Sequence, residues 1–88
     1  MTYTITITGK GGHGSRPDLS INPLDCFTAI YTALRPLPGF QVEKVNGGTS
    51  GNVIPAQVIF TFRCDAPREL IAQVAENTAK PFRCTVEM

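Results

Sequence analysis

The sequence lacks several features that mark common classes of protein. Its formal net charge is only +1 at pH 7, and its lysine and arginine residues occur singly, so it has no basic surface of the kind that binds nucleic acid or anionic membranes. No apolar run approaches the ~20 residues of a membrane-spanning helix, and no secretory signal opens the chain. The 88 residues suffice for a single domain with a modest core.

Cysteine and histidine are also scarce. Cys26, Cys64 and Cys84 are too far apart for a C-x-x-C clip, and an odd number of cysteines without a signal peptide predicts a reducing, cytoplasmic location. Each has apolar neighbours, so we interpret all three as small buried hydrophobic residues. A nucleophilic cysteine paired with His13 is the alternative, but no sequence neighbour would lower its pKa. One histidine and seven dispersed acidic residues supply no set of three or four ligands, so we expect no metal site in this chain.

Strand and helix patterns alternate along the sequence. Residues 3–8 alternate tyrosine or isoleucine with threonine, which is typical of an antiparallel strand with one face open to water. Asn22 followed by Pro23 indicates the N-terminus of a helix. Further strands are expected over residues 40–46, 57–65 and 82–88, and a second helix is expected between Pro67 and Pro81.

This order of elements predicts the α+β class. Its simplest arrangement is a two-layer sandwich, in which a four-stranded antiparallel sheet of order 4-1-3-2 carries two helices on one face, the ferredoxin-like βαββαβ fold. In that arrangement the loop with His13 and the hairpin that leads to Asn52 lie at one end of the sheet, and both termini lie together at the other. We therefore expect residues 1–88 to form one domain inserted in a larger protein, with a compact free-standing domain as the alternative.

The two loops are rich in glycine, and each admits an ordinary interpretation. Gly9, Gly11 and Gly14 spell G-x-G-x-x-G after a strand, but a dinucleotide site needs the helix to begin on that loop, and here it begins near Asn22. His13 could be a solvated loop residue. An asparagine at position 52 could simply shape the hairpin turn.

Several motifs, taken together, resemble one known family. The segments GKGGHGSRP (residues 9–17) and GGTSGNVIP (residues 47–55), with Asn22-Pro23 between them, are similar to the lid or dimerisation domain of the dinuclear-metal aminoacylases, hippurate hydrolases and related carboxypeptidases, closest to the N-acyl-amino-acid amidohydrolase branch. The resemblance covers essentially the whole chain. It implies a larger catalytic domain that carries two divalent metal ions, of the zinc or manganese type, and a glutamate general base, with no cofactor bound by this chain.

The resemblance also implies roles for individual residues. His13 matches a histidine that reaches into the partner subunit's active site and donates a hydrogen bond to the developing oxyanion, and Asn52 matches an asparagine that holds the substrate. The family's strand-end arginine falls on Asp65. Arg63, two residues earlier on the same strand face, is the candidate replacement, about 7 Å away. Lid domains of this family pair, and the predicted strand order leaves residues 40–46 at an edge, so we expect a homodimer through that strand and the first helix.

Two other functions stay open at this point. A free-standing ferredoxin-like domain could hold a small ligand, such as an amino acid, at the same loop end, or the chain could be a purely structural oligomerisation module. As the leading hypothesis, the chain is the lid of a metal-dependent hydrolase that cleaves N-acyl amino acids or small peptides. The chain alone lacks the metal ligands and the general base for that reaction.

Overall fold

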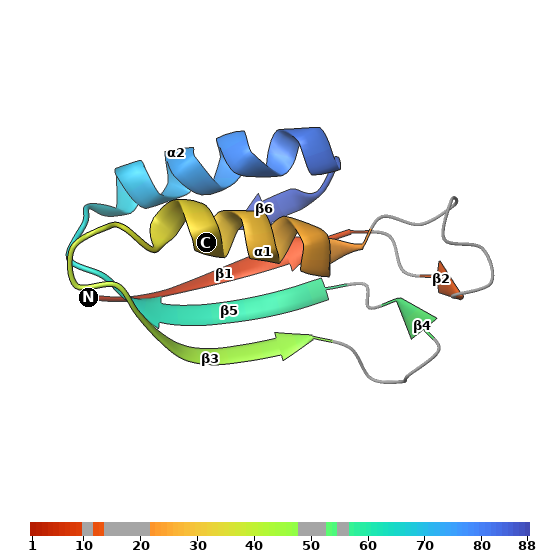
Figure 1. Cartoon of the computed structure of the whole chain (residues 1–88), viewed down its shortest axis with the longest axis horizontal. Helices are drawn as coiled ribbons and strands as arrows, with labels where there is room; N and C mark the ends of the chain where they lie inside the picture. Colours follow the sequence, from red (N-terminus) through yellow and green to blue (C-terminus); the bar gives the residue numbers. More distant parts are fainter. Residues whose placement is uncertain (10–11, 14–21, 48–52, 55–56) are drawn as a thin grey trace.

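The structure is a computed structural model, and it describes residues 1–9, 12–13, 22–47, 53–54 and 57–88. The main sheet is antiparallel, with the order β3-β5-β1-β6. Its strands are β1 (Thr2–Thr8), β3 (Gln41–Gly47), β5 (Gln57–Arg63) and β6 (Thr85–Glu87). A second, two-stranded sheet pairs β2 (Gly12–His13) with β4 (Val53–Ile54). The helices α1 (Pro23–Leu34) and α2 (Arg68–Ala79) lie over one face of the main sheet (Figure 1). The predicted strands 1 to 4 correspond to β1, β3, β5 and β6, so the observed order is the predicted order 4-1-3-2 listed from the other edge. The predicted α+β fold and strand order are confirmed.

Helix α1 begins where the sequence predicts. The Asn22 side chain accepts a hydrogen bond from the Leu24 backbone N–H at 3.0 Å, and Pro23 occupies the first helical position, where a missing N–H costs nothing. The buried face of the helix is the row that contains Cys26, Ile30 and Leu34. Leu24 is 38% exposed, and the smaller Cys26 is buried in the core instead.

The core lies between the helices and the inner faces of β1 and β5. Its largest members alternate along the two strands as predicted: Tyr3, Ile5, Ile7, Val58, Phe60 and Phe62. The Phe60 and Phe62 rings stack with centroids 4.8 Å apart, and Phe27 of α1 meets Phe60 edge-on at 5.0 Å. On the open face the hydroxyls of Thr4 and Thr61 are 3.2 Å apart. The alternation of apolar and threonine residues therefore sets both faces of the sheet.

The C-terminal part departs from the prediction in detail. Helix α2 turns Ile71, Ala75 and Ala79 inward, and Leu70 is 40% exposed rather than buried. A 3₁₀ helix then spans Lys80–Phe82, and Arg83 adopts a left-handed backbone conformation with φ 58°. These turns shorten the last strand to β6.

The short last strand also changes where the chain ends. Strand β6 pairs only with the stretch of β1 from Thr6 to Thr8. Met88 therefore lies part-way along β1 rather than beside Met1, as Figure 1 shows, and the expectation that the two ends lie side by side is wrong in that respect.

Candidate functional site

The two glycine-rich loops meet beyond one end of the main sheet. We call this end, where β1 finishes at Thr8 and β5 begins at Gln57, the loop end. Strand β2 pairs antiparallel with β4, with His13 opposite Val53 and Gly12 opposite Ile54. The small sheet extends past the loop end (Figure 1). The prediction that the loops converge is therefore confirmed for the described residues, whereas Asn52, the residue before Val53, lies outside them.

The main sheet aligns the strands that lead into these loops. Thr8 is opposite Gln57, whose side-chain amide lies 3.5 Å from the Thr8 hydroxyl. On the other side of β5, Gly47 ends β3 against Val58, and a Cβ added to Gly47 would lie 3.0 Å from a Val58 methyl group. A glycine there lets β3 approach β5 closely before the chain enters the second loop.

Arg63, the third predicted site residue, lies at the opposite end of β5. It is paired in register with Thr2 on one side and Gln41 on the other. Seven strand residues span about 20 Å, so the structure does not bring Arg63 near the loop end within one chain. Its guanidinium Nε is 3.9 Å from the Glu43 carboxylate, and both side chains are largely exposed, at 61% and 42%. Such an exposed ion pair is weak and leaves the guanidinium available to another partner.

Two cysteines, Cys26 and Cys84, have thiols whose pKa is raised. Burial, with a smaller contribution from Cys84, raises the pKa of the Cys26 thiol to about 12. Burial also raises the pKa of Cys84, while the interaction with Cys26 opposes that shift.

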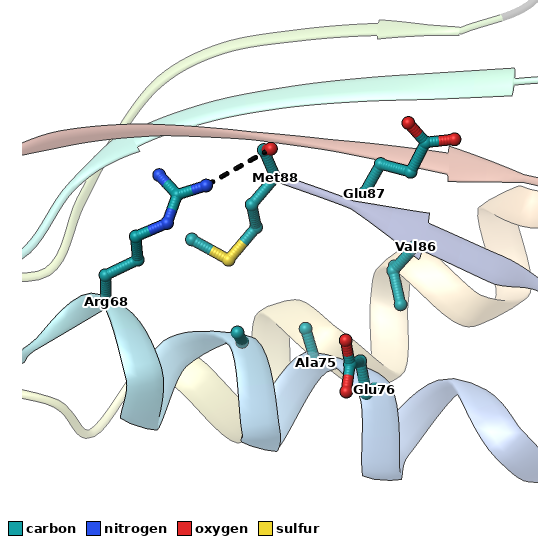
Figure 2. A pocket seen from close by; sticks show the side chains of 7 residues that line it. Arg68, Ala75, Glu76, Val86, Glu87 and Met88 are labelled. Atoms are coloured by element: carbon teal, nitrogen blue, oxygen red, sulfur yellow. Dashed lines mark hydrogen bonds between the residues drawn. The ribbon is translucent and has the colours of Figure 1, made fainter.

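A pocket of about 290 Å³ lies between α2 and β6, and none of the residues that line it is a predicted site residue (Figure 2). Its lining is mixed: Arg68, Ala72, Ala75, Glu76, Val86, Glu87 and Met88. The Arg68 guanidinium donates a hydrogen bond to the Met88 carbonyl at 3.3 Å. The pocket therefore lies between a helix and the edge strand, and its lining residues are not part of the loop-end site.

The described residues contain no obvious place for a metal ion or a membrane span. Across residues 1–9, 12–13, 22–47, 53–54 and 57–88, no three histidine, cysteine, aspartate or glutamate side chains gather as ligands. Within the same ranges, no helix is long and apolar enough to cross a bilayer. The donor set described here does not fit a metal centre.

Two known proteins illustrate which sequences are similar to this chain. The chain is 32% identical over 98 residues to a succinyl-diaminopimelate desuccinylase from Psychrobacter sp. (strain PRwf-1), a match that covers 92% of this chain and 24% of that protein. It is 35% identical over 66 residues to an IAA-amino acid hydrolase of Arabidopsis thaliana, covering 64% of this chain and 15% of that one. The chain thus spans about a quarter or less of the length of these relatives.

Solved structures share the fold. An aminobenzoyl-glutamate utilization protein from Klebsiella pneumoniae superposes with a TM-score of 0.80 at 18% identity, covering 98% of this chain and 26% of that one. The aminopeptidase PepT from Bacillus cereus superposes with a TM-score of 0.78 at 17% identity, covering 98% and 27%. The sequence pattern of the peptidase dimerisation domain matches residues 1–83. This chain therefore belongs to the family of peptidase dimerisation domains.

Proposed function

We propose that residues 1–88 are the dimerisation and lid domain of a metal-dependent enzyme that hydrolyses amide bonds in N-acyl amino acids or small peptides. Two of its relatives are a desuccinylase and an amino acid hydrolase, and both names describe the removal of a group from an amino acid. The observation that carries the proposal is the pairing of His13 with Val53, which holds the two conspicuous loops together at one end of the domain. The remainder of the enzyme would be a separate catalytic domain.

Strand β3 is the proposed dimer contact. It is an edge of the main sheet, all seven of its residues are exposed, and the other edge strand, β6, has only three residues. Val42 and Val45 are opposite Phe62 and Phe60, so they lie on the helix-covered face, yet they remain 39% and 43% exposed. An edge with free backbone groups and uncovered apolar side chains favours pairing with a second copy of the chain.

The neighbouring helix would contribute to the same contact. Tyr31 of α1 meets Phe40, just before β3, with ring centroids 5.8 Å apart, and both side chains are only partly buried. These rings continue the apolar margin from Val42 and Val45 onto the helix layer. A homodimer through β3 and α1 would bury this margin.

A two-fold dimer of this kind would also bring Arg63 toward the loop end of the partner subunit. Antiparallel pairing of two β3 strands reverses their direction, so the Gln41 end of one strand lies beside the Gly47 end of the other. Arg63, opposite Gln41, would then lie at the same end of the combined sheet as the loop end of the partner subunit. Three strand spacings, about 14 Å, separate these positions, which leaves room for a substrate between two long side chains.

The residue types suit the proposed chemistry. The imidazole of His13 and the carboxamide of Asn52 can each donate a hydrogen bond to an amide oxygen that gains negative charge, and Arg63 can bind the carboxylate of an amino acid in a bidentate manner. Two divalent ions bound by the catalytic domain would supply a Lewis acid and an activated water. The donor from His13 contributes most in the transition state, where one such donor is worth roughly 3–4 kcal/mol.

Substitution of His13 in the complete enzyme tests the proposal. His13→Ala removes the donor, and we expect turnover to fall about a hundredfold or more, while the dimer persists because β3 is unchanged. Thr4→Ala on the open sheet face is the matched control and should retain normal turnover. Unchanged turnover in the His13→Ala enzyme would contradict the proposed function.

A further inference from the structure

The β-bulge in β3 decides which side chains of this edge strand share a face. Val42 and Lys44 are opposite consecutive residues of β5, so Glu43 is the extra residue between them. Val42 and Val45 therefore both lie on the helix-covered face, although they are three positions apart, whereas Lys44 lies on the open face. In a regular strand, residues three positions apart lie on opposite faces. The bulge thus changes which pairings with another strand are possible.

An anion and a cation are adjacent at this bulge. Glu43 and Lys44 are both exposed. The Glu43 carboxylate is 3.9 Å from Nε of Arg63, and its side chain is still 42% exposed, so it is held only weakly within its own chain. Among the residues that the structure describes, Lys44 forms no ion pair. A second copy of the chain that runs antiparallel presents the same two charges in the reverse order, so the edge is complementary to itself.

A two-fold axis restricts how two β3 strands pair. The axis stands perpendicular to a continuous sheet, so each residue lies on the same face in both copies, and residues opposite each other must share a face. Val42 opposite the partner's Val45 satisfies this condition because of the bulge. The same register places Glu43 opposite the partner's Lys44, and Lys44 opposite the partner's Glu43. Two valine pairs and two pairs of opposite charges therefore form together.

Other registers are less favourable. A shift by one position places Glu43 opposite Glu43 in one direction and Lys44 opposite Lys44 in the other, and each shift sets a valine of the helix-covered face against a residue of the open face. A register centred on Val45 keeps the faces matched. It places Lys44 opposite Asn46 and Glu43 opposite Gly47, so no opposite charges meet.

We propose that Glu43 and Lys44 determine the partner and the register of this edge, which binds a second copy of the chain with Val42 opposite the partner's Val45 and Glu43 opposite the partner's Lys44. This inference rests on the proposed function, which supplies the dimer through β3. The valine pairs join the two apolar margins beside α1, and the charge pairs lie at the two bulges. Opposite charges across the strands favour this register, and like charges disfavour the neighbouring ones.

Charge reversal in the complete enzyme tests the two charge pairs. Glu43→Lys sets two lysines opposite each other twice in each dimer, and Lys44→Glu does the same with two glutamates. We expect each variant alone to dimerise about tenfold more weakly in sedimentation equilibrium. An equimolar mixture of the two should form heterodimers with nearly the wild-type affinity. The double variant Glu43→Lys/Lys44→Glu has the wild-type net charge and should again form homodimers, so it is the matched control.

A cross-link measures the register directly. Val42→Cys and Val45→Cys enzymes are unfolded and refolded together and then mildly oxidised, with the wild type treated in the same way as the control. Opposite residues of antiparallel strands have Cα atoms about 4.5–5.5 Å apart, which is within the range of a disulfide. Peptide mapping without reduction should find position 42 joined to position 45, and neither variant alone should link its two β3 strands.

The outcomes separate this inference from the proposed function. A link between two copies of the Val45→Cys chain would establish the register centred on Val45 and overturn the inference. Single charge reversals that leave dimerisation unchanged, or a double variant that stays as weak as the single ones, would also overturn it. In each of these cases a dimeric wild type whose turnover depends on His13 would leave the proposed function intact. A monomeric wild type would instead remove the dimer, and this inference with it.

Discussion

Mixing two inactive variants would test whether the site is shared between subunits. Within one chain, about 20 Å of β5 separates Arg63 from the loop end that carries His13. A small substrate can therefore contact both side chains only if they come from different subunits. His13→Ala should lower kcat about a hundredfold, and Arg63→Ala should lower kcat/KM at least about tenfold, because a charge-assisted bond to the substrate is lost.

The expected recovery follows from the number of intact sites. When the two variants are unfolded and refolded together, random assortment makes half of the dimers mixed. One of the two sites in each mixed dimer receives both wild-type residues, so activity should return to roughly a quarter of the wild-type value. Steady-state assays at substrate concentrations well below KM, where the rate reports kcat/KM, would measure it, with each variant refolded alone as the control. If both residues acted from the same chain, every site would retain one defect, and the absence of recovery would refute the shared site.

Three further predictions follow from single features. Val45→Lys should weaken dimerisation about tenfold or more in sedimentation equilibrium, whereas Ile59→Lys, at a similarly exposed position on the open face, should not; equal effects would contradict the β3 contact. Asn22→Ala should lower the free energy of unfolding by about 1 kcal/mol in urea titrations, because it removes the cap of α1, and no change would contradict that role. Because the folded-state pKa of Cys26 is raised to about 12, the folded chain holds a proton that the unfolded chain loses above about pH 9. Stability should therefore fall more steeply between pH 9 and pH 12 in the wild type than in Cys26→Ala, and identical slopes would show that the thiol is not buried in solution.

The strand layout could be predicted because a strand that buries one face has apolar residues at every second position of its sequence. In β1 and β5, one register buries large apolar residues, whereas the alternative register would bury the threonines of β1 and the polar residues Gln57 and Arg63 of β5, so only one assignment is stable. The order of the strands then follows from short, right-handed connections. The convergence of the loops at His13 is a consequence of that order rather than of any local signal.

Other details depend on packing that no local pattern encodes. Leu24 and Leu70 have the helical spacing of core residues, yet each helix is rotated so that a neighbour, Cys26 in α1 and Ile71 in α2, is buried instead. The strands β2 and β4 have two residues each, which is too short for any periodicity to detect. The second helix ends in a 3₁₀ turn that contacts α1, and no repeat in the sequence marks that turn.

Strand β3 shows how such a detail can decide the character of a surface. Strict alternation would put Lys44 on the same face as Val42, against the helix layer, and would turn Val45 toward the open face. The β-bulge between Val42 and Lys44 absorbs one residue, so Lys44 pairs with Thr61 on the open face and Val45 returns to the helix-covered face. The bulge thus gathers both valines beside α1 and sends the lysine away from them. It converts an edge strand of mixed polarity into one with an apolar margin suited to a second copy of the chain, which is why the dimer contact could be expected from topology but its chemistry could not.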